Sequence, residues 1–104
     1  MTASGFLTVA PQVEGSMAPE IAKAIDALEE HPVHYETTPM GTLLEAEDAG
    51  TLFAAAQAAH EAVDSDRAVT FLKVDDKRAT DAPMREKVES VEEQLGREAR
   101  GGPD

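Results

Sequence analysis

The chain contains no cysteine, and this absence excludes several kinds of site at once. Without thiols a protein forms no disulfide bond, binds no iron–sulfur cluster and has neither a thiolate nucleophile nor a Cys-ligated zinc ion. The three histidines, His31, His34 and His60, do not follow the spacing of a metal-binding motif. We therefore expect no metal site and no required cofactor.

Aromatic residues are also scarce, with no Trp, one Tyr and three Phe among 104 residues. A core with so few rings must be filled by aliphatic side chains, methionine and alanine. Hydrophobic residues still make up 41% of the chain, which indicates a folded domain and not a disordered one. The length fits one domain, which we place at residues 1–95, followed by a flexible tail at residues 96–104.

Basic residues are few, because nine Lys and Arg stand against 21 Asp and Glu, for a formal net charge of −12. Binding to a phosphate backbone needs a basic surface, so we expect no nucleic-acid partner. The acidic residues are spread along the whole chain, as in proteins that stay soluble at high ionic strength, where salt screens repulsion between like charges. The sequence thus favours a halophilic source, and an ordinary acidic protein is the alternative.

Long apolar runs are missing too. No segment approaches the length of a membrane span, and residues 1–5 lack the basic and apolar regions of a signal peptide. We expect a cytoplasmic protein without a membrane partner.

The chain does contain a regular succession of strand and helix signals. Runs of β-forming residues predict strands over residues 6–10, 33–38, 42–45 and 68–74. Apolar residues at helical spacing predict helices over residues 16–30 and 48–63, and a third after a charged loop at 75–81. The first six elements have the order of the split β-α-β-β-α-β unit. The sequence therefore predicts an α+β, ferredoxin-like antiparallel sheet with an extra C-terminal helix.

Two apolar surfaces have no partner within this fold. The expected fourth strand is apolar on both faces, although helices cover only one face of such a sheet. Its two faces carry Ala68, Leu72 and Val74 on one side, and Val69 and Phe71 on the other. The third helix carries a stripe made of Met84, Val88, Val91 and Leu95. These surfaces predict self-association through the open sheet face or the third helix.

No pair of side chains suits acid–base or nucleophilic catalysis. Asp75 and Asp76 are adjacent, so in a strand they point to opposite faces. Ser16 has no histidine placed to activate it, and its position before a helix favours a role as N-cap. We therefore expect a binding protein and not an enzyme.

The segment from Tyr35 to Glu45 is the most informative part of the chain. On one interpretation its role is structural, because Pro39 and Gly41 shape a turn and threonine is a strand former. On the other, a rigid hairpin presents hydroxyls, a soft apolar contact and one carboxylate at the edge of a cleft. The residues concerned are Thr38, Met40, Gly41, Thr42 and Glu45. This set suits a small polar or cationic ring. Free N–H groups at the helix start near Ser16 favour hydroxyl or anionic groups.

Three segments in a fixed order also carry a family resemblance. They are Tyr35-Glu36 with Thr38-Pro39-Met40-Gly41-Thr42 and Glu45, then Ala59-His60-Glu61-Ala62-Val63, then Lys73-Val74-Asp75-Asp76-Lys77-Arg78. In these segments the chain resembles the YkoF-like thiamine-binding proteins in their single-domain form. The chain departs from the family pattern at Ala46, where glycine is usual, and at Gln12 and Glu14.

The resemblance implies a ferredoxin-like fold, assembly into a dimer of dimers, and binding of thiamine or its hydroxymethylpyrimidine moiety without catalysis. We expect this ligand between the start of the first helix and the hairpin. The residues expected to bind it are Ser16, Thr38, Met40, Gly41, Thr42 and Glu45. The alternative is a structural or regulatory oligomer that binds a protein partner through the open sheet face or the C-terminal helix.

Overall fold

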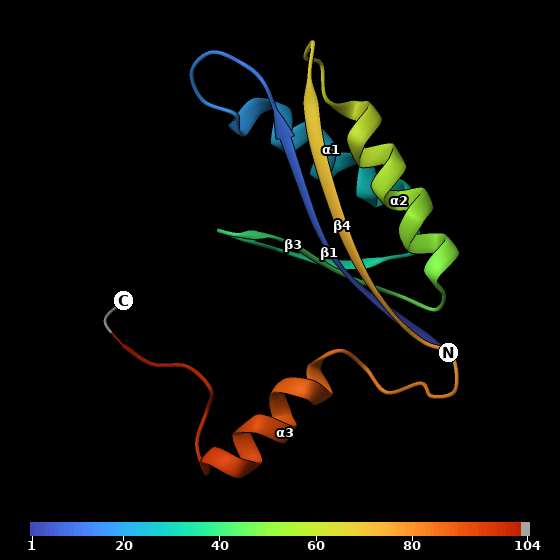
Figure 1. The fold of residues 1–104 in the computed structure, drawn as a ribbon, viewed down its shortest axis with the longest axis vertical. Coiled ribbons are helices and arrows are strands. Elements are labelled where there is room, and N and C mark those ends of the chain that lie inside the picture. Colours follow the sequence, from blue (N-terminus) through green and yellow to red (C-terminus); the bar gives the residue numbers. More distant parts are fainter. Residues whose placement is uncertain (103–104) are drawn as a thin grey trace.

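A four-stranded antiparallel sheet forms the centre of the molecule (Figure 1). The computed structural model describes residues 1–102. The strands are β1 (Thr2–Pro11), β2 (His34–Thr38), β3 (Gly41–Ala46) and β4 (Ala68–Lys77), in the spatial order β2-β3-β1-β4. The helices are α1 (Ala18–Ala27), the short 3-10 helix η1 (Leu28–Glu30), α2 (Ala49–Ala62) and α3 (Arg85–Leu95). The predicted α+β, ferredoxin-like arrangement is confirmed.

Two strands, β1 and β4, extend by three or more residues beyond the predicted bounds, and their pairing with each other explains both extensions. The strand expected at residues 6–10 begins at Thr2, and β4 continues to Lys77 through residues predicted to form a charged loop. Thr2, Ala3 and Ser4 pair with Lys77, Asp76 and Asp75. A complete row of backbone partners outweighs the low strand propensity of aspartate.

Local hydrogen bonds determine where α2 and α3 begin. Asp48, where the second helix was expected to begin, is the N-cap of α2, and its carboxylate accepts the Thr51 N–H at 2.8 Å. Hydrogen bonds from the Thr51 hydroxyl and N–H hold the pKa of Asp48 below its ordinary value. By contrast, α3 begins only at Arg85, after tighter turns in which the Pro83 and Met84 carbonyl oxygens accept the Glu86 and Lys87 N–H groups.

The hydrophobic core lies between the sheet and the two helices α1 and α2. Its largest buried side chains include Leu28, Leu44 and Leu52. Three fully or almost fully buried alanines, Ala24, Ala55 and Ala59, let the helices approach the sheet closely. The core is therefore aliphatic, as the scarcity of aromatic residues predicts. On the opposite, open sheet face, Phe71 remains 57% exposed.

Helix α3 stands apart from this core (Figure 1). It has no buried residue, and Val88, Val91 and Leu95 are 37%, 52% and 46% exposed. The radius of gyration is 15.4 Å, against about 13 Å for a compact domain of this length. Polar contacts hold this segment, since Glu45 accepts the Met84 N–H and Lys87 pairs with Asp75. The Lys87 hydrogen bond keeps the pKa of Asp75 below its ordinary value.

The end of the chain was expected to form a tail from residue 96. Gly96 ends α3 in a left-handed conformation with φ of 71°, and residues 97–102 lie outside any helix or strand. Pro103 and Asp104, the last residues of the expected tail, lie outside the described residues. Among residues 1–102, no helix has the length and apolar character needed to cross a membrane.

Candidate functional site

A cavity of about 160 Å³ lies between α1 and the β2–β3 hairpin. Its walls come from three elements that are far apart in the sequence. β1 contributes Leu7, Thr8 and Val9; α1 contributes Ile21, Ala24 and Ile25; the hairpin contributes Thr37, Thr38, Pro39, Met40, Gly41 and Thr42. The cavity therefore borders the middle of α1 and the hairpin, whereas the sequence analysis expects the ligand between the start of this helix and the hairpin.

Thr37 and Thr42 give this cavity its polar part, whereas Thr38, the next residue in β2, holds the turn of the hairpin. The Thr42 side chain is almost fully buried, and its Oγ1 lies 3.3 Å from Thr37 Oγ1 across the two strands. Thr38 Oγ1 donates to the Gly41 carbonyl oxygen at 2.7 Å and accepts the Met40 N–H at 3.3 Å. The Thr37–Thr42 contact is longer than the Thr38–Gly41 hydrogen bond, so the Thr37 and Thr42 hydroxyls can turn towards a bound polar group.

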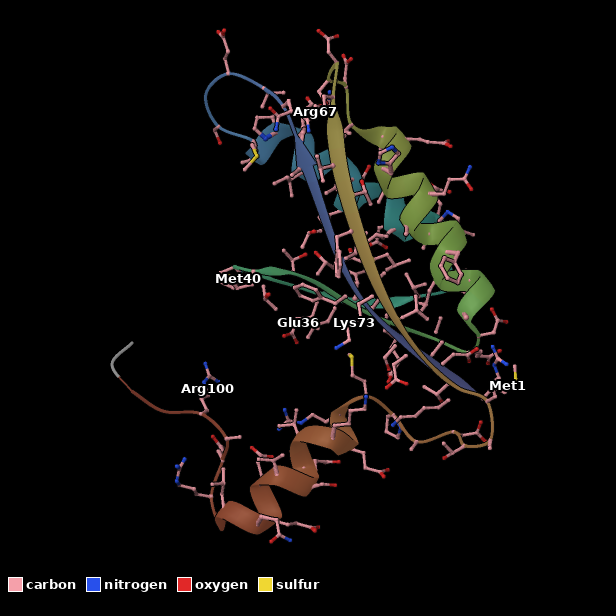
Figure 2. The ribbon with its side chains drawn as sticks, viewed as in Figure 1. Met1, Glu36, Met40, Arg67, Lys73 and Arg100 are labelled. Atoms are coloured by element: carbon pink, nitrogen blue, oxygen red, sulfur yellow. The ribbon has the colours of Figure 1, made fainter. Side chains whose placement is uncertain are left out.

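Met40 lies at the tip of the hairpin, at the mouth of the cavity (Figure 2). Its side chain is 80% exposed. A thioether in this position can pack against the face of a flat ring that enters the cavity.

Gly41 lets the hairpin approach β1 closely. A Cβ atom at this position would lie 2.4 Å from Phe6 Cζ and 2.9 Å from Thr8 Cγ2. Any larger residue would therefore push the hairpin and β1 apart at the edge of the cavity.

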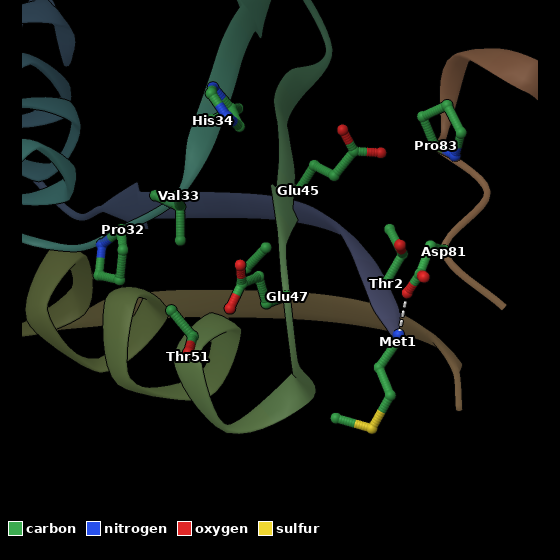
Figure 3. Close-up of a pocket in the computed structure, with 11 residues that line it drawn as sticks. Met1, Thr2, Pro32, Val33, His34, Glu45, Glu47, Thr51, Asp81 and Pro83 are labelled. Carbon is green, nitrogen blue, oxygen red and sulfur yellow. Dashed lines mark hydrogen bonds and ion pairs between the residues drawn. The ribbon is translucent and has the colours of Figure 1, made fainter. Parts of the chain in front are cut away.

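The structure places Ser16 and Glu45 outside this cavity. Ser16 lies two residues before α1, where its hydroxyl accepts the Ala18 N–H at 3.1 Å. Glu45 lines a different and larger cavity of about 540 Å³, between the ends of β2 and β3 and the segment that leads to α3 (Figure 3). There its carboxylate accepts the Met84 N–H. The expected six-residue set is thus divided among three places: Ser16 before α1, Glu45 in the larger cavity, and Thr38, Met40, Gly41 and Thr42 together in the smaller one.

The cavity between α1 and the hairpin suits binding better than chemistry. Its lining consists of apolar residues, threonines, one proline, one methionine and one glycine, so it presents hydroxyls and apolar contacts. Threonine hydroxyls far from a base are weak nucleophiles. Among residues 1–102, no group of three or more carboxylate and histidine side chains is placed to hold a metal ion.

Sequence reasoning missed the contribution of α1 to the cavity wall. Ile21, Ala24 and Ile25 follow helical spacing, which predicts only a core stripe. In the structure Ala24 is buried, whereas Ile21 and Ile25 are half-buried and line the cavity. A helix stripe gives no indication of which of its members face an unfilled space, so no signal in the sequence separates these residues from the core.

Relatives in other organisms share most of the chain. A UPF0045 protein of Methanothermobacter thermautotrophicus is 49% identical over 94 residues, which cover 86% of this chain and 95% of the relative. The UPF0045 protein YqgV of Bacillus subtilis is 35% identical over 92 residues, which cover 85% of this chain and 86% of the relative.

Solved structures show the same architecture. A hypothetical protein of Methanocaldococcus jannascii has a TM-score of 0.79 at 28% identity, over 88% of this chain and 97% of the other. A putative thiamine biosynthesis/salvage protein of Thermotoga maritima has a TM-score of 0.72 over 88% of this chain and 99% of the other, and its 22% identity bears on the fold alone. The profile of the family described as thiamine-binding protein matches residues 6–92. These matches, together with the hairpin residues quoted above, show that the chain belongs to the YkoF-like thiamine-binding protein family.

Proposed function

We propose that the protein is a cytoplasmic, non-catalytic binding protein for thiamine or its hydroxymethylpyrimidine moiety. The observation that carries this proposal is the cavity between α1 and the hairpin, which gathers Thr38, Met40, Gly41 and Thr42. These are residues of the hairpin motif that links the chain to the family. Our proposal rests on these four residues and does not include Ser16 or Glu45.

The size of the cavity favours one ring over two. Cavities that enclose drug-sized ligands usually measure about 300–1,000 Å³, whereas this one measures about 160 Å³. We propose that the aminopyrimidine ring enters the cavity between Ile25 and the hairpin, with its polar edge towards the threonine hydroxyls. The thiazolium ring of thiamine would then remain at the mouth beside Met40, where its charge stays hydrated.

Calorimetric titration with thiamine and with hydroxymethylpyrimidine tests the proposal. We expect both compounds to bind the wild-type protein. Thr42→Val should weaken both by about three- to tenfold, because it removes one hydrogen-bonding group and keeps a similar shape.

Glu45→Gln is the matched control, because Glu45 lies in the other cavity and this change should leave both affinities unaltered. Melting curves of each variant show whether the fold is retained. No measurable heat with either compound for the wild type would refute the proposed function. If only Glu45→Gln loses affinity for the two compounds, their binding site is the larger cavity that Glu45 lines.

We further propose that the protein self-associates, and that its assembly is the dimer of dimers implied by the family resemblance. An 11-residue helix without tertiary packing is marginal in water, so α3 needs a surface to cover its apolar stripe. The exposed Val69 and Phe71 on the open sheet face offer a second apolar surface. A purely structural or regulatory oligomer, which binds a protein partner through the same surfaces, is the alternative function.

A further inference from the structure

Two carboxylates of the open sheet face hold the start of α3. Glu45 in β3 accepts the N–H of Met84, the N-cap residue of α3. Asp75 in β4 pairs with Lys87, three residues further along the helix. Both carboxylates belong to cross-strand partners of Ser4, so they lie in one row across the sheet. Negative groups are favourable at the positive N-terminal end of a helix, and two contacts in one turn fix its direction as well as its position.

In this direction α3 stands away from its own sheet (Figure 1). Val91 in the apolar stripe of the helix and Phe71 on the open sheet face are each more than half exposed. While the contacts of Glu45 and Asp75 hold, the stripe leaves Phe71 of its own chain uncovered. Each of the two apolar surfaces therefore needs a cover from another molecule.

The open sheet face has the dimensions of a single helix. Residues paired across strands share a face, and the apolar ones on the side away from α1 and α2 are Phe6, Ala10, Leu43, Val69 and Phe71. Along β1 the distance from Phe6 to Ala10 is about 13 Å, and the three strands β3, β1 and β4 span about 10 Å. The stripe from Val88 to Leu95 is about 10 Å long, and a helix with its side chains is about 10 Å wide.

The polar borders of the two surfaces are complementary. One row of the open face runs from Glu36 at the β2 edge to Lys73 at the β4 edge, and within residues 1–102 neither forms an ion pair. On α3, Glu92 borders the stripe on one side and the uncharged Gln94 on the other. The Glu92 carboxylate contacts Arg85 at 3.3 Å and can accept further donors. A helix that lies with Glu92 beside Lys73 turns Gln94, and not a carboxylate, towards Glu36.

We infer that α3 of one copy packs on the open sheet face of a second copy, and that the second copy returns the contact. The inference rests on the proposed self-association and names the two surfaces that meet in it. A twofold axis makes the exchange reciprocal, so each dimer contains two equal contacts between a helix and a sheet. In this arrangement α3 gains the tertiary packing that an 11-residue helix needs.

Mixing a sheet variant with a helix variant tests this contact. Phe71→Asp places a charge on the open face and Val91→Asp places one in the stripe, both at exposed positions, so each copy should keep its fold. We expect each variant alone to raise the dissociation constant of the oligomer at least about tenfold, because an unpaired charge enters an apolar contact. In an equimolar mixture a mixed dimer keeps one intact contact. Sedimentation velocity should then show association at least about tenfold tighter than for either variant alone.

Leu95→Asp mixed with Val91→Asp is the matched control, because both changes lie in α3 and no mixed dimer then has an intact contact. We expect this mixture to associate as weakly as its components. Packing of sheet on sheet, of helix on helix, or of α3 on its own sheet predicts no gain in either mixture. A wild-type oligomer without a gain in the mixture of Phe71→Asp and Val91→Asp would therefore overturn the inference, as would an oligomer that neither change weakens. A monomeric wild type would overturn the self-association on which the inference rests.

Discussion

At the scale of single residues, Gly41 has the tightest surroundings of any glycine in residues 1–102. We expect Gly41→Ala to lower the free energy of unfolding by about 1–3 kcal/mol, as overpacking does, because the added methyl group meets Phe6 and Thr8. Denaturant unfolding measures this change.

Gly50→Ala is the control for this change. Gly50 lies in the first turn of α2, and a Cβ atom there would meet only Asp48 Oδ1, at 3.6 Å. We expect it to raise the free energy of unfolding by about 0.4–1 kcal/mol, because alanine restricts the unfolded chain. A Gly41→Ala protein as stable as wild type would show that the hairpin can retreat from β1 without cost.

The sequence pattern already contains enough information to place Thr42 and Glu45 on different faces of the sheet. Thr42 and Glu45 are three positions apart in one strand, so their side chains must point to opposite faces. In the structure Thr42 faces the helices and Glu45 faces the segment before α3. The alternation of side chains along a strand is therefore sufficient to separate these two residues. The position of Ser16 could not be settled in this way, because the path of a loop depends on tertiary contacts.

At the scale of elements, α3 is the part of the fold that the sequence describes least completely. Its apolar stripe is evident from helical spacing, and the helix is present. Periodicity indicates that a face will be covered, but it does not say whether the cover comes from the same chain or from another. β4 shows the same limit, since its extension to Lys77 depends on a partner strand more than 60 residues away.

Val91→Asp tests whether the α3 stripe is an interface. We expect the change to raise the dissociation constant of the oligomer by at least about tenfold, because it places an unpaired charge in an apolar contact. Light scattering over a range of protein concentrations measures the mass of the assembly. Ser90→Asp adds the same charge next to the stripe on an exposed position and should have little effect. A wild-type protein that is a monodisperse monomer at micromolar concentration would contradict the proposed self-association.

At the scale of the whole molecule, the fold itself was predictable. The order of strand and helix signals indicates the ferredoxin-like topology because each element has a distinct apolar period and a clear boundary, such as Pro39 and Gly41 in the hairpin. The cavity was only partly predictable, because its α1 wall depends on how a helix and a hairpin from different parts of the chain meet.

The net charge of −12 leads to a prediction for the whole chain. We expect the melting temperature to rise between about 0.1 M and about 1 M sodium chloride, because the screening length falls from about 10 Å to about 3 Å over this range. Chloride is preferred to sulfate, since sulfate also strengthens apolar burial. A melting temperature that does not change over this range would remove the halophilic interpretation.

The central position of β1 has a consequence for the synthesis of the protein. β1 lies between β3 and β4, and it pairs with β4 along all ten of its residues. During synthesis, the edge of β1 that pairs with β4 therefore stays uncovered until residues 68–77 have been made. Until then the nascent chain exposes an uncovered strand edge, which is the type of surface on which incomplete chains aggregate.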